Sequence, residues 1–438
     1  MGHNAGVITP GRRASTVLLA SASLVAAALA ATVVGPAVAA DRPTTTQART
    51  ATTPAKPTTP AEQRIADLVP DRLADPRLGS TVSVQIIDAR SGRSIVTQRT
   101  RRPMLPASNM KVVTAMAALQ QLGADYRFTT RVVQGPLGRQ VFLVGGGDPI
   151  LTSSQLAELA DDTATALIAS GDTSITLLID DSLYPTPTNA PGWPDDYVPD
   201  VVRPIRALTL WNLVSMDTSA YVGAQFADML RTRGITVTTG GRGIAPDSGT
   251  MLASYAGNRL DRALGLILPP SNNDATEILA RHIAIDRGLP PTWDGTSMAI
   301  MQVLEELGVP TAGIIVADGS GLSRNDRLTT RTLIALLQLA SRRGVDPFDA
   351  LIPSLPVSGE TGTLASRYRW APSACAAGEV RAKTGTLFDT VALSGVTRGD
   401  DGRLRIFSIL VNNRPQSVLT FDTREAVDAL AATVNGCY

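Results

Sequence analysis

The order of helical and extended patterns along the chain constrains its fold most strongly. Apolar residues predict a strand near the start, at residues 81–88, and three more near the end, at 380–384, 390–397 and 404–412. Helical patterns dominate the stretch between residues 260 and 342. Because both ends supply strands around a helical middle, the sequence predicts one α/β domain that is interrupted by an insertion.

The insertion is expected where the character of the sequence changes. Gly and Pro become frequent after residue 127, and only short strands, such as 140–144 and 174–180, are predicted between loops. A chain of 438 residues also exceeds what one compact core accommodates. We therefore expect residues 128–251 to form an inserted domain, and residues 62–127 and 252–438 to form the α/β domain together.

The N-terminal residues indicate a targeting segment. The pair Arg12-Arg13 precedes an apolar run over residues 17–34, and Ala37-Val38-Ala39 supplies a small-residue cleavage site. Residues 1–39 therefore predict a secretory signal, with an uncleaved membrane anchor as the alternative, since the run approaches the length that spans a bilayer. Residues 40–61, rich in Thr, Pro and Ala, predict a flexible linker.

The charged residues limit the classes of function. The net charge of +1 argues against nucleic acid as a partner. The only histidines are His3 and His282, so a histidine-based metal site is excluded, and we expect no metal and no cofactor. His282 lies among apolar residues of a predicted helix, which favours a structural role. Of the 40 basic residues only Lys56, Lys111 and Lys383 are lysines, and lysine, unlike arginine, can lose its proton inside a protein.

Two of these lysines fall in short motifs that carry chemistry. Lys111 follows Ser108 by three residues at the start of a helix predicted over 110–122, so the lysine nitrogen can reach the serine hydroxyl. This spacing predicts a nucleophilic Ser108 with Lys111 as its base. Lys383 begins the string Lys383-Thr384-Gly385-Thr386 at the end of a predicted strand, where the glycine permits the backbone of a substrate to approach closely.

A third motif, Ser271-Asn272-Asn273, opens the helix predicted from residue 274. It supplies a second hydroxyl and a carboxamide, and the alternative interpretation is that one of these residues only caps the helix. Each motif is weak by itself. Together, their order and separation match a known set of catalytic motifs.

With these motifs the chain resembles the serine penicillin-binding proteins and serine β-lactamases. Within them it resembles the D-alanyl-D-alanine carboxypeptidase/endopeptidase family, the low-molecular-mass class C penicillin-binding proteins, which have an insertion between the first two motifs. The resemblance covers residues 63–438 and is weakest across the insertion, and the string Glu360-Thr361-Gly362-Thr363 departs from a family segment that often carries Asp-Gly. The strings that support the narrower match are Leu105-Pro106-Ala107-Ser108-Asn109-Met110-Lys111, Gly145-Gly146-Gly147-Asp148-Pro149, Asp318-Gly319-Ser320-Gly321-Leu322-Ser323 and Arg381-Ala382-Lys383-Thr384-Gly385-Thr386-Leu387.

The resemblance implies a transpeptidase-like domain with an antiparallel sheet flanked by helices. It also implies that Ser108 attacks a peptide carbonyl, that neutral Lys111 accepts the proton, and that Ser271 passes a proton to the leaving amine. We expect burial and the nearby charge of Lys383 to lower the pKa of Lys111.

The same resemblance assigns residues to the substrate. Asn273 is expected to hold the substrate amide, and the segment of Lys383, Thr384, Gly385 and Thr386 is expected to receive the terminal carboxylate. The backbone N–H groups of Thr386 and of the nucleophile are expected to form the oxyanion hole.

The predicted activity is hydrolysis of peptidoglycan stem peptides that end in, or are cross-linked through, a D-alanyl-D-amino acid bond, with β-lactams as further ligands. A β-lactamase or esterase of the same fold, and a non-catalytic cell-wall-binding protein, are the alternatives. The expected location is the extracytoplasmic cell envelope, with membrane contact only through the N-terminal segment. An oxidising compartment would let Cys375 pair with Cys437, and two free thiols are the alternative. Asp148, in the glycine-rich string, is interpreted as a turn former.

Overall fold

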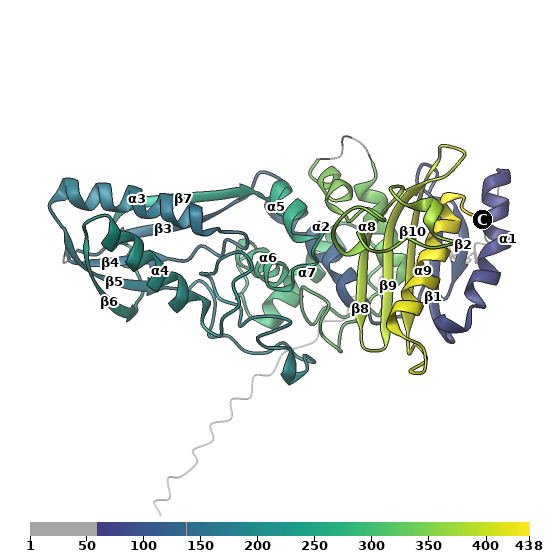
Figure 1. The fold of residues 1–438 in the computed structure, drawn as a ribbon, viewed down its shortest axis with the longest axis horizontal. Coiled ribbons are helices and arrows are strands. Elements are labelled where there is room, and N and C mark those ends of the chain that lie inside the picture. The colour runs from purple at the N-terminus through teal and green to yellow at the C-terminus, as the bar shows by residue number, and fades with distance from the viewer. Residues whose placement is uncertain (1–58, 137, 343, 345) are drawn as a thin grey trace, which may run out of the picture. The chain divides into compact units, whose positions relative to one another are not determined.

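The computed structural model describes residues 59–136, 138–342, 344 and 346–438 and contains two five-stranded sheets covered by helices (Figure 1). The predicted signal or anchor, and the predicted linker up to residue 58, lie outside these residues. The end of that linker belongs to a helix instead. Helix α1 (Pro60–Leu73) begins there because Thr59 caps it and Glu62 returns a hydrogen bond to the Thr59 N–H. Among the described residues, no helix combines the length and the apolar character needed to cross a bilayer.

The first sheet combines strands from the beginning and from the end of the described residues. Its strand order is β2-β1-β10-β9-β8, and all neighbours are antiparallel. Strand β1 pairs with β10 along its whole length, from Thr81 opposite Asn412 to Asp88 opposite Arg405. The predicted α/β class with an antiparallel sheet is therefore confirmed. The strands are β1 (Thr81–Asp88), β2 (Ser94–Gln98), β8 (Val380–Leu387), β9 (Thr390–Arg398) and β10 (Leu404–Asn412).

Helices cover both faces of this sheet, which explains why β9 and β10 are buried along nearly their full length. One face packs Val391, Phe407 and their neighbours against α1 and the C-terminal helix α9. The opposite face packs Val396 and Ile406 against a larger group of helices. These helices are α2 (Met110–Leu122), α5 (Leu260–Ile267), α6 (Asn273–Asp286), α7 (Trp293–Glu306) and α8 (Thr330–Ala340), and α9 spans Thr420–Asn435.

Helix α2 is the central element of the larger helical group. Its first ten residues, Met110 to Leu119, are all buried, and Lys111 is among them. The helix ends at Gly123, whose φ of 81° is a conformation that glycine adopts without steric cost. The predicted helix over 110–122 therefore has the observed bounds, and it carries a lysine into the protein interior.

A second sheet is formed largely by the segment predicted as an insertion, although its last strand runs beyond residue 251. Its order is β6-β5-β4-β3-β7, in which β5 pairs in parallel with both β4 and β6 and the remaining pairs are antiparallel. Parallel pairs need crossover connections, and α3 (Ser153–Ser170) and α4 (Thr218–Thr232) provide them and pack on the sheet. The strands are β3 (Arg127–Gln134), β4 (Gln140–Val144), β5 (Ser174–Asp180), β6 (Thr236–Arg242) and β7 (Thr250–Arg259).

The two crossover helices correct the sequence-based expectation of only short strands and loops in this segment. The buried face of α3 includes Ala160, Thr163 and Ala164. Small and polar residues at buried positions weaken the apolar period from which a helix is predicted. The helix ends were nevertheless marked, because Thr152 and Gln155 form a capping box and Gly171 is the left-handed C-cap.

The second sheet begins and ends with neighbouring strands. β3 follows α2, β7 precedes α5, and the two strands pair antiparallel with Arg127 opposite Arg259. The chain therefore leaves the helical layer and returns to it at adjacent positions. The boundaries proposed for the inserted domain, 128 and 251, fall inside these two strands and stay a prediction.

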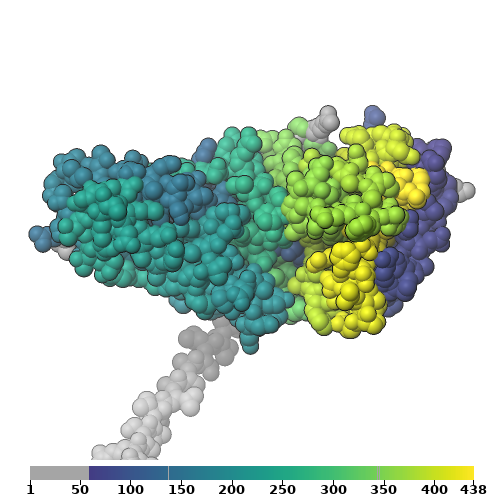
Figure 2. Space-filling view, in the orientation of Figure 1, coloured from purple at the N-terminus to yellow at the C-terminus, as the bar shows by residue number. Residues whose placement is uncertain are grey.

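A disulfide joins Cys375 to Cys437. Of the two predicted alternatives, paired cysteines or two free thiols, the structure has the pair. It links the segment that precedes β8 to the residues that follow α9, across 62 residues of sequence. In the space-filling view the yellow C-terminal helix borders the lime-green segment before β8 (Figure 2). These two parts of the surface also contribute to the wall of the cavity beside Ser108, which is described next.

Candidate active site

Ser108 lies in a single 3-10 turn, Ala107–Asn109, directly before α2. Ala107 has a φ of 47°, which is uncommon for a residue with a side chain and typical of strained functional sites. The turn packs closely against Gly321, where only a glycine fits, because a Cβ at that residue would lie 1.9 Å from the Ala107 oxygen. The strained turn places Ser108 at the mouth of a cavity of about 300 Å³.

Lys111 reaches Ser108 from one turn further along. Its Nζ lies 3.1 Å from Ser108 Oγ, 2.8 Å from Asn273 Oδ1 and 2.7 Å from the Ser320 backbone oxygen. The lysine side chain is fully buried. The structure thus brings together the nucleophile, the base and the carboxamide that the sequence predicted, and it adds Ser320, which the sequence analysis did not single out.

Burial lowers the pKa of Lys111 from 10.5 to about 8. The nearby carboxylates of Asp318 and Glu277 act in the opposite direction, because a negative charge favours the protonated amine. Burial, followed by the charge of Lys111, lowers the pKa of Lys383 well below its ordinary value. The predicted effect of the Lys383 charge on the pKa of Lys111 is not among the causes of that shift, and only the reverse effect, of Lys111 on Lys383, is present. Burial is the main cause of both shifts.

Glu277 fixes the loop that contacts Lys111. Its carboxylate accepts hydrogen bonds from the N–H groups of Gly319, at 3.1 and 3.0 Å, and Ser320, at 2.8 Å. Asp318, in the same loop, accepts from the N–H groups of Gly321 and Ser323. These backbone bonds orient the Ser320 oxygen toward Lys111. The string from Asp318 to Ser323 carried a family resemblance, but nothing in it indicated this contact.

The three residues of the motif at 271–273 make different contacts. Asn272 is the helix cap, because its side chain accepts from the Ala275 N–H at 2.9 Å. Ser271 has a φ of 60° and lines the cavity beside the nucleophile. Asn273 donates through Nδ2 to the Val201 oxygen at 2.8 Å while its Oδ1 faces Lys111. The capping interpretation therefore applies to Asn272, and the other two residues are available for the site.

Strand β8 forms the opposite wall. Thr384 and Thr386 line the cavity, whereas Lys383 is fully buried and its Nζ donates to the Thr384 backbone oxygen at 3.1 Å. A Cβ at Gly385 would lie 2.8 Å from the Pro106 oxygen. The glycine is therefore required because the turn that carries Ser108 packs closely against it. The sequence had indicated a close approach at this position too, but by the backbone of a substrate. The expected role of Lys383 stays a prediction.

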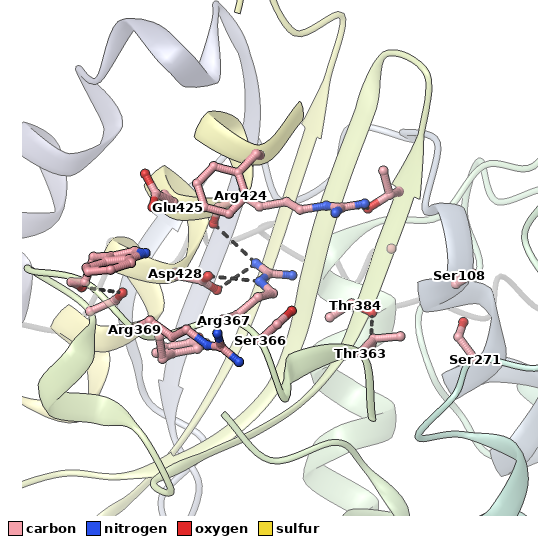
Figure 3. Close-up of a pocket in the computed structure, with 16 residues that line it drawn as sticks. Ser108, Ser271, Thr363, Ser366, Arg367, Arg369, Thr384, Arg424, Glu425 and Asp428 are labelled. Atoms are coloured by element: carbon pink, nitrogen blue, oxygen red, sulfur yellow. Dashed lines mark hydrogen bonds and ion pairs between the residues drawn. The ribbon is translucent and has the colours of Figure 1, made fainter. Parts of the chain in front are cut away.

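The cavity extends from the two serines along β8 to helix α9, and Figure 3 shows that its lining side chains come from parts of the chain that are far apart in sequence. Beyond Thr384 the wall is charged. Arg367 and Asp428 form a buried ion pair with a distance of 2.6 Å, and Arg424 donates to Thr386 Oγ1. These residues could not be predicted from the sequence, because they follow no motif and are brought together only by the fold.

His282 and Asp148 lie apart from this cavity and have structural contacts. His282 bonds the Gly147 oxygen at 3.0 Å and the Tyr126 hydroxyl at 3.1 Å, and burial lowers its pKa to about 4. Asp148 accepts from the Ile150 N–H at 2.9 Å, the geometry of a side chain that stabilises a turn. Both contacts support the structural roles that the sequence indicated.

A buried lysine whose nitrogen contacts a serine hydroxyl is the arrangement of enzymes that form an acyl-enzyme without a catalytic histidine. The fold and the site therefore define a serine acyl-transferring enzyme of the penicillin-binding class. Comparison with known sequences gives the family: the chain belongs to the D-Ala-D-Ala carboxypeptidase 3 (S13) family, which it matches over residues 65–217 and 211–434.

Individual relatives agree with this membership. The chain is 32% identical to carboxypeptidase DacB of Mycolicibacterium smegmatis, over 86% of this chain and 85% of the relative. It is 29% identical to a D-alanyl-D-alanine carboxypeptidase of an Actinomadura species, over 83% of this chain and 84% of the relative. Among solved structures, penicillin binding protein 4 of Haemophilus influenzae superposes with a TM-score of 0.72 at 21% identity, over 84% of this chain and 98% of that one. At this identity the superposition shows the shared fold.

Proposed function

We propose that this protein is a serine D-alanyl-D-alanine carboxypeptidase that hydrolyses peptidoglycan stem peptides, and their D-alanyl cross-links, through an acyl-enzyme on Ser108. The 3.1 Å contact between Lys111 Nζ and Ser108 Oγ carries the proposal. Membership of the S13 family and the name of the Actinomadura relative support the substrate class.

The contacts of Lys111 suit a neutral base. A neutral amine has two N–H bonds and one lone pair. The oxygens of Asn273 and Ser320 can only accept hydrogen bonds, so they take both N–H groups and leave the lone pair for the Ser108 proton. The Val201 oxygen fixes the orientation of the Asn273 amide, because it must face the Nδ2 group.

Acylation follows from these positions. Ser108 Oγ attacks the carbonyl carbon of the penultimate D-alanine while its proton passes to Lys111 Nζ. The tetrahedral oxyanion is held by the backbone N–H groups of Ser108 and Thr386. Its collapse breaks the C–N bond, and Ser271 gives its hydroxyl proton to the leaving amine and regains one from protonated Lys111, which becomes neutral again. Water then attacks the ester and releases the shortened peptide.

The edge of the first sheet supports binding of an extended peptide. β8 is an edge strand of the first sheet. Among the described residues, the only β-pairing on its outer edge is an isolated bridge between Val357 and Arg381. The remaining edge faces the nucleophile, so a peptide substrate can add as a further strand. Asn273 would hold the substrate amide from the opposite side, and the Thr384 and Thr386 hydroxyls would receive the terminal carboxylate.

We also propose that the enzyme works outside the cytoplasm. Peptidoglycan is an extracytoplasmic substrate, and the Cys375–Cys437 disulfide is of the kind that persists in oxidising compartments. Export through the segment at residues 1–39, whether cleaved or kept as an anchor, is part of the same proposal.

Mass spectrometry after incubation with a β-lactam tests the proposal. The adduct is expected on the peptide that contains Ser108, to be lost in Ser108→Ala, and to persist in Ser170→Ala, which removes an exposed hydroxyl at the end of α3. Hydrolysis of a D-alanyl-D-alanine peptide should disappear with the adduct. Rapid turnover of the β-lactam would instead identify a β-lactamase, and absence of any adduct would identify a non-catalytic wall-binding protein.

A further inference from the structure

Arg424 presents a positive charge to the cavity and forms no ion pair with a carboxylate of the described residues. The acidic side chains near it on α9 are already paired. Asp428 binds Arg367 at 2.6 Å, and Glu425 lies 3.6 Å from Arg77. Arg424 itself is only partly buried and remains a cation, since arginine keeps its proton in proteins. A cation at a cavity wall without an ionic partner indicates a site for an anionic ligand.

The guanidinium is aimed at the substrate side of β8. Arg424 Nε and Nη2 both donate to Thr386 Oγ1, at 3.3 and 3.1 Å. Two parallel N–H donors are the fork that binds a carboxylate in bidentate geometry. Thr384 lies two residues earlier on the same face of the strand and lines the same cavity. Figure 3 shows the Arg424 side chain extending from α9 toward the end of the cavity where Ser108 lies.

Lys383 does not provide this charge at the cavity wall. It is fully buried, it is absent from the residues that line the cavity, and its Nζ contacts the Thr384 backbone oxygen. Burial and the charge of Lys111 lower its pKa well below the ordinary value. Of Lys383 and Arg424, only Arg424 is therefore placed to contact a ligand in the cavity.

We infer that Arg424, together with the Thr384 and Thr386 hydroxyls, binds the free carboxylate of the leaving amino acid. The inference rests on the proposed function, because Ser271, the proposed donor to the leaving amine, lines this cavity and so places the leaving group in it. Arg424 is then the residue that makes the enzyme require a free carboxyl end.

Two peptides that differ only at their C-terminus test this role. One ends in D-alanyl-D-alanine with a free carboxylate, and the other in the corresponding carboxamide. In Arg424→Ala, kcat/KM for the free acid is expected to fall about 10- to 100-fold, the value of a charged hydrogen bond, while kcat/KM for the carboxamide stays unchanged. An equal loss with both peptides would mean that Arg424 only supports Thr386 and its strand, and no loss with either would also overturn the inference.

Arg369 offers a matched control. It is an exposed arginine of the same cavity, and Figure 3 places it on the side away from Ser108. Arg369→Ala is expected to keep the preference for the free acid. If it lowers that preference as much as Arg424→Ala does, the diffuse positive field of the cavity, and not a direct contact, selects the carboxylate. Equal melting temperatures of the variants confirm that the fold is intact.

A second pair of ligands separates this inference from the proposed function. Benzylpenicillin carries a carboxylate, and its methyl ester does not. Arg424→Ala is expected to slow acylation of Ser108 by the acid and to leave acylation by the ester unchanged. If the wild-type enzyme is acylated but hydrolyses no D-alanyl-D-alanine peptide, the proposed function fails and the penicillin pair still decides the role of Arg424.

Discussion

The buried position of Lys111 predicts how the acylation rate depends on pH. In the proposed mechanism acylation uses the neutral amine, so the acylation rate should rise as pH increases through the Lys111 pKa. With a pKa of about 8, about 1% of the lysine is neutral at pH 6 and about half at pH 8. The second-order rate constant should therefore rise about 50-fold between these two pH values and level off about one pH unit above the pKa. An exposed lysine with the ordinary pKa of 10.5 would still be gaining rate beyond pH 10.

The assay is single-turnover acylation by a fluorescent penicillin, followed by stopped flow from pH 5.5 to 10. Thermal unfolding at each pH establishes that the enzyme stays folded. Lys111→Arg is the matched variant, because it keeps a cation but cannot serve as a base, and its acylation should be slow at every pH. A wild-type rate that is independent of pH between 6 and 9, or an inflection near 10.5, would refute the assignment of Lys111 as a neutral base.

Three further changes test the surroundings of the site. Glu277→Gln removes a carboxylate that raises the pKa of Lys111, so the inflection of the same pH profile should move to lower pH, and an upward move would contradict this. Gly385→Ala places a Cβ 2.8 Å from the Pro106 oxygen, and should lower the free energy of unfolding by about 1–3 kcal/mol and slow acylation. An alanine variant with wild-type denaturation and acylation would count against that contact. Cys375→Ser opens a loop of 62 residues and should cost about 2–4 kcal/mol in urea unfolding, whereas an unchanged midpoint would show that the cross-link adds no stability.

The sequence predicted the features of this protein that depend on neighbouring residues. The contact between Ser108 and Lys111 spans three residues within one helical turn, so spacing alone indicates it. Strand β1 and helix α2 have the predicted bounds, because regular apolar patterns and Gly123 mark them. The motif at residue 271 was found for the same reason, although only the structure shows that Asn272 is the cap.

Features that depend on distant residues could not be predicted in this way. The Ser320 oxygen that faces Lys111 lies 209 residues away from it in sequence, and Glu277 orients that oxygen through backbone bonds that any residue type could offer. Arg424 is one of 37 arginines in the chain, and its sequence neighbours do not distinguish it. Its importance follows only from the packing of α9 on one face of the first sheet, which brings Arg424 to Thr386 of β8.

Because β3 pairs with β7, the segment that forms the second sheet should have considerable freedom to change in length and sequence. A segment whose two ends meet can be lengthened, shortened or exchanged without pulling apart the helices on either side of it. That freedom is limited where the segment contacts the site: the Val201 oxygen, which belongs to this segment, holds the Asn273 amide in the orientation that Lys111 needs. A chimaera that replaces the segment should keep its catalytic rate only where the new backbone presents a carbonyl at that point.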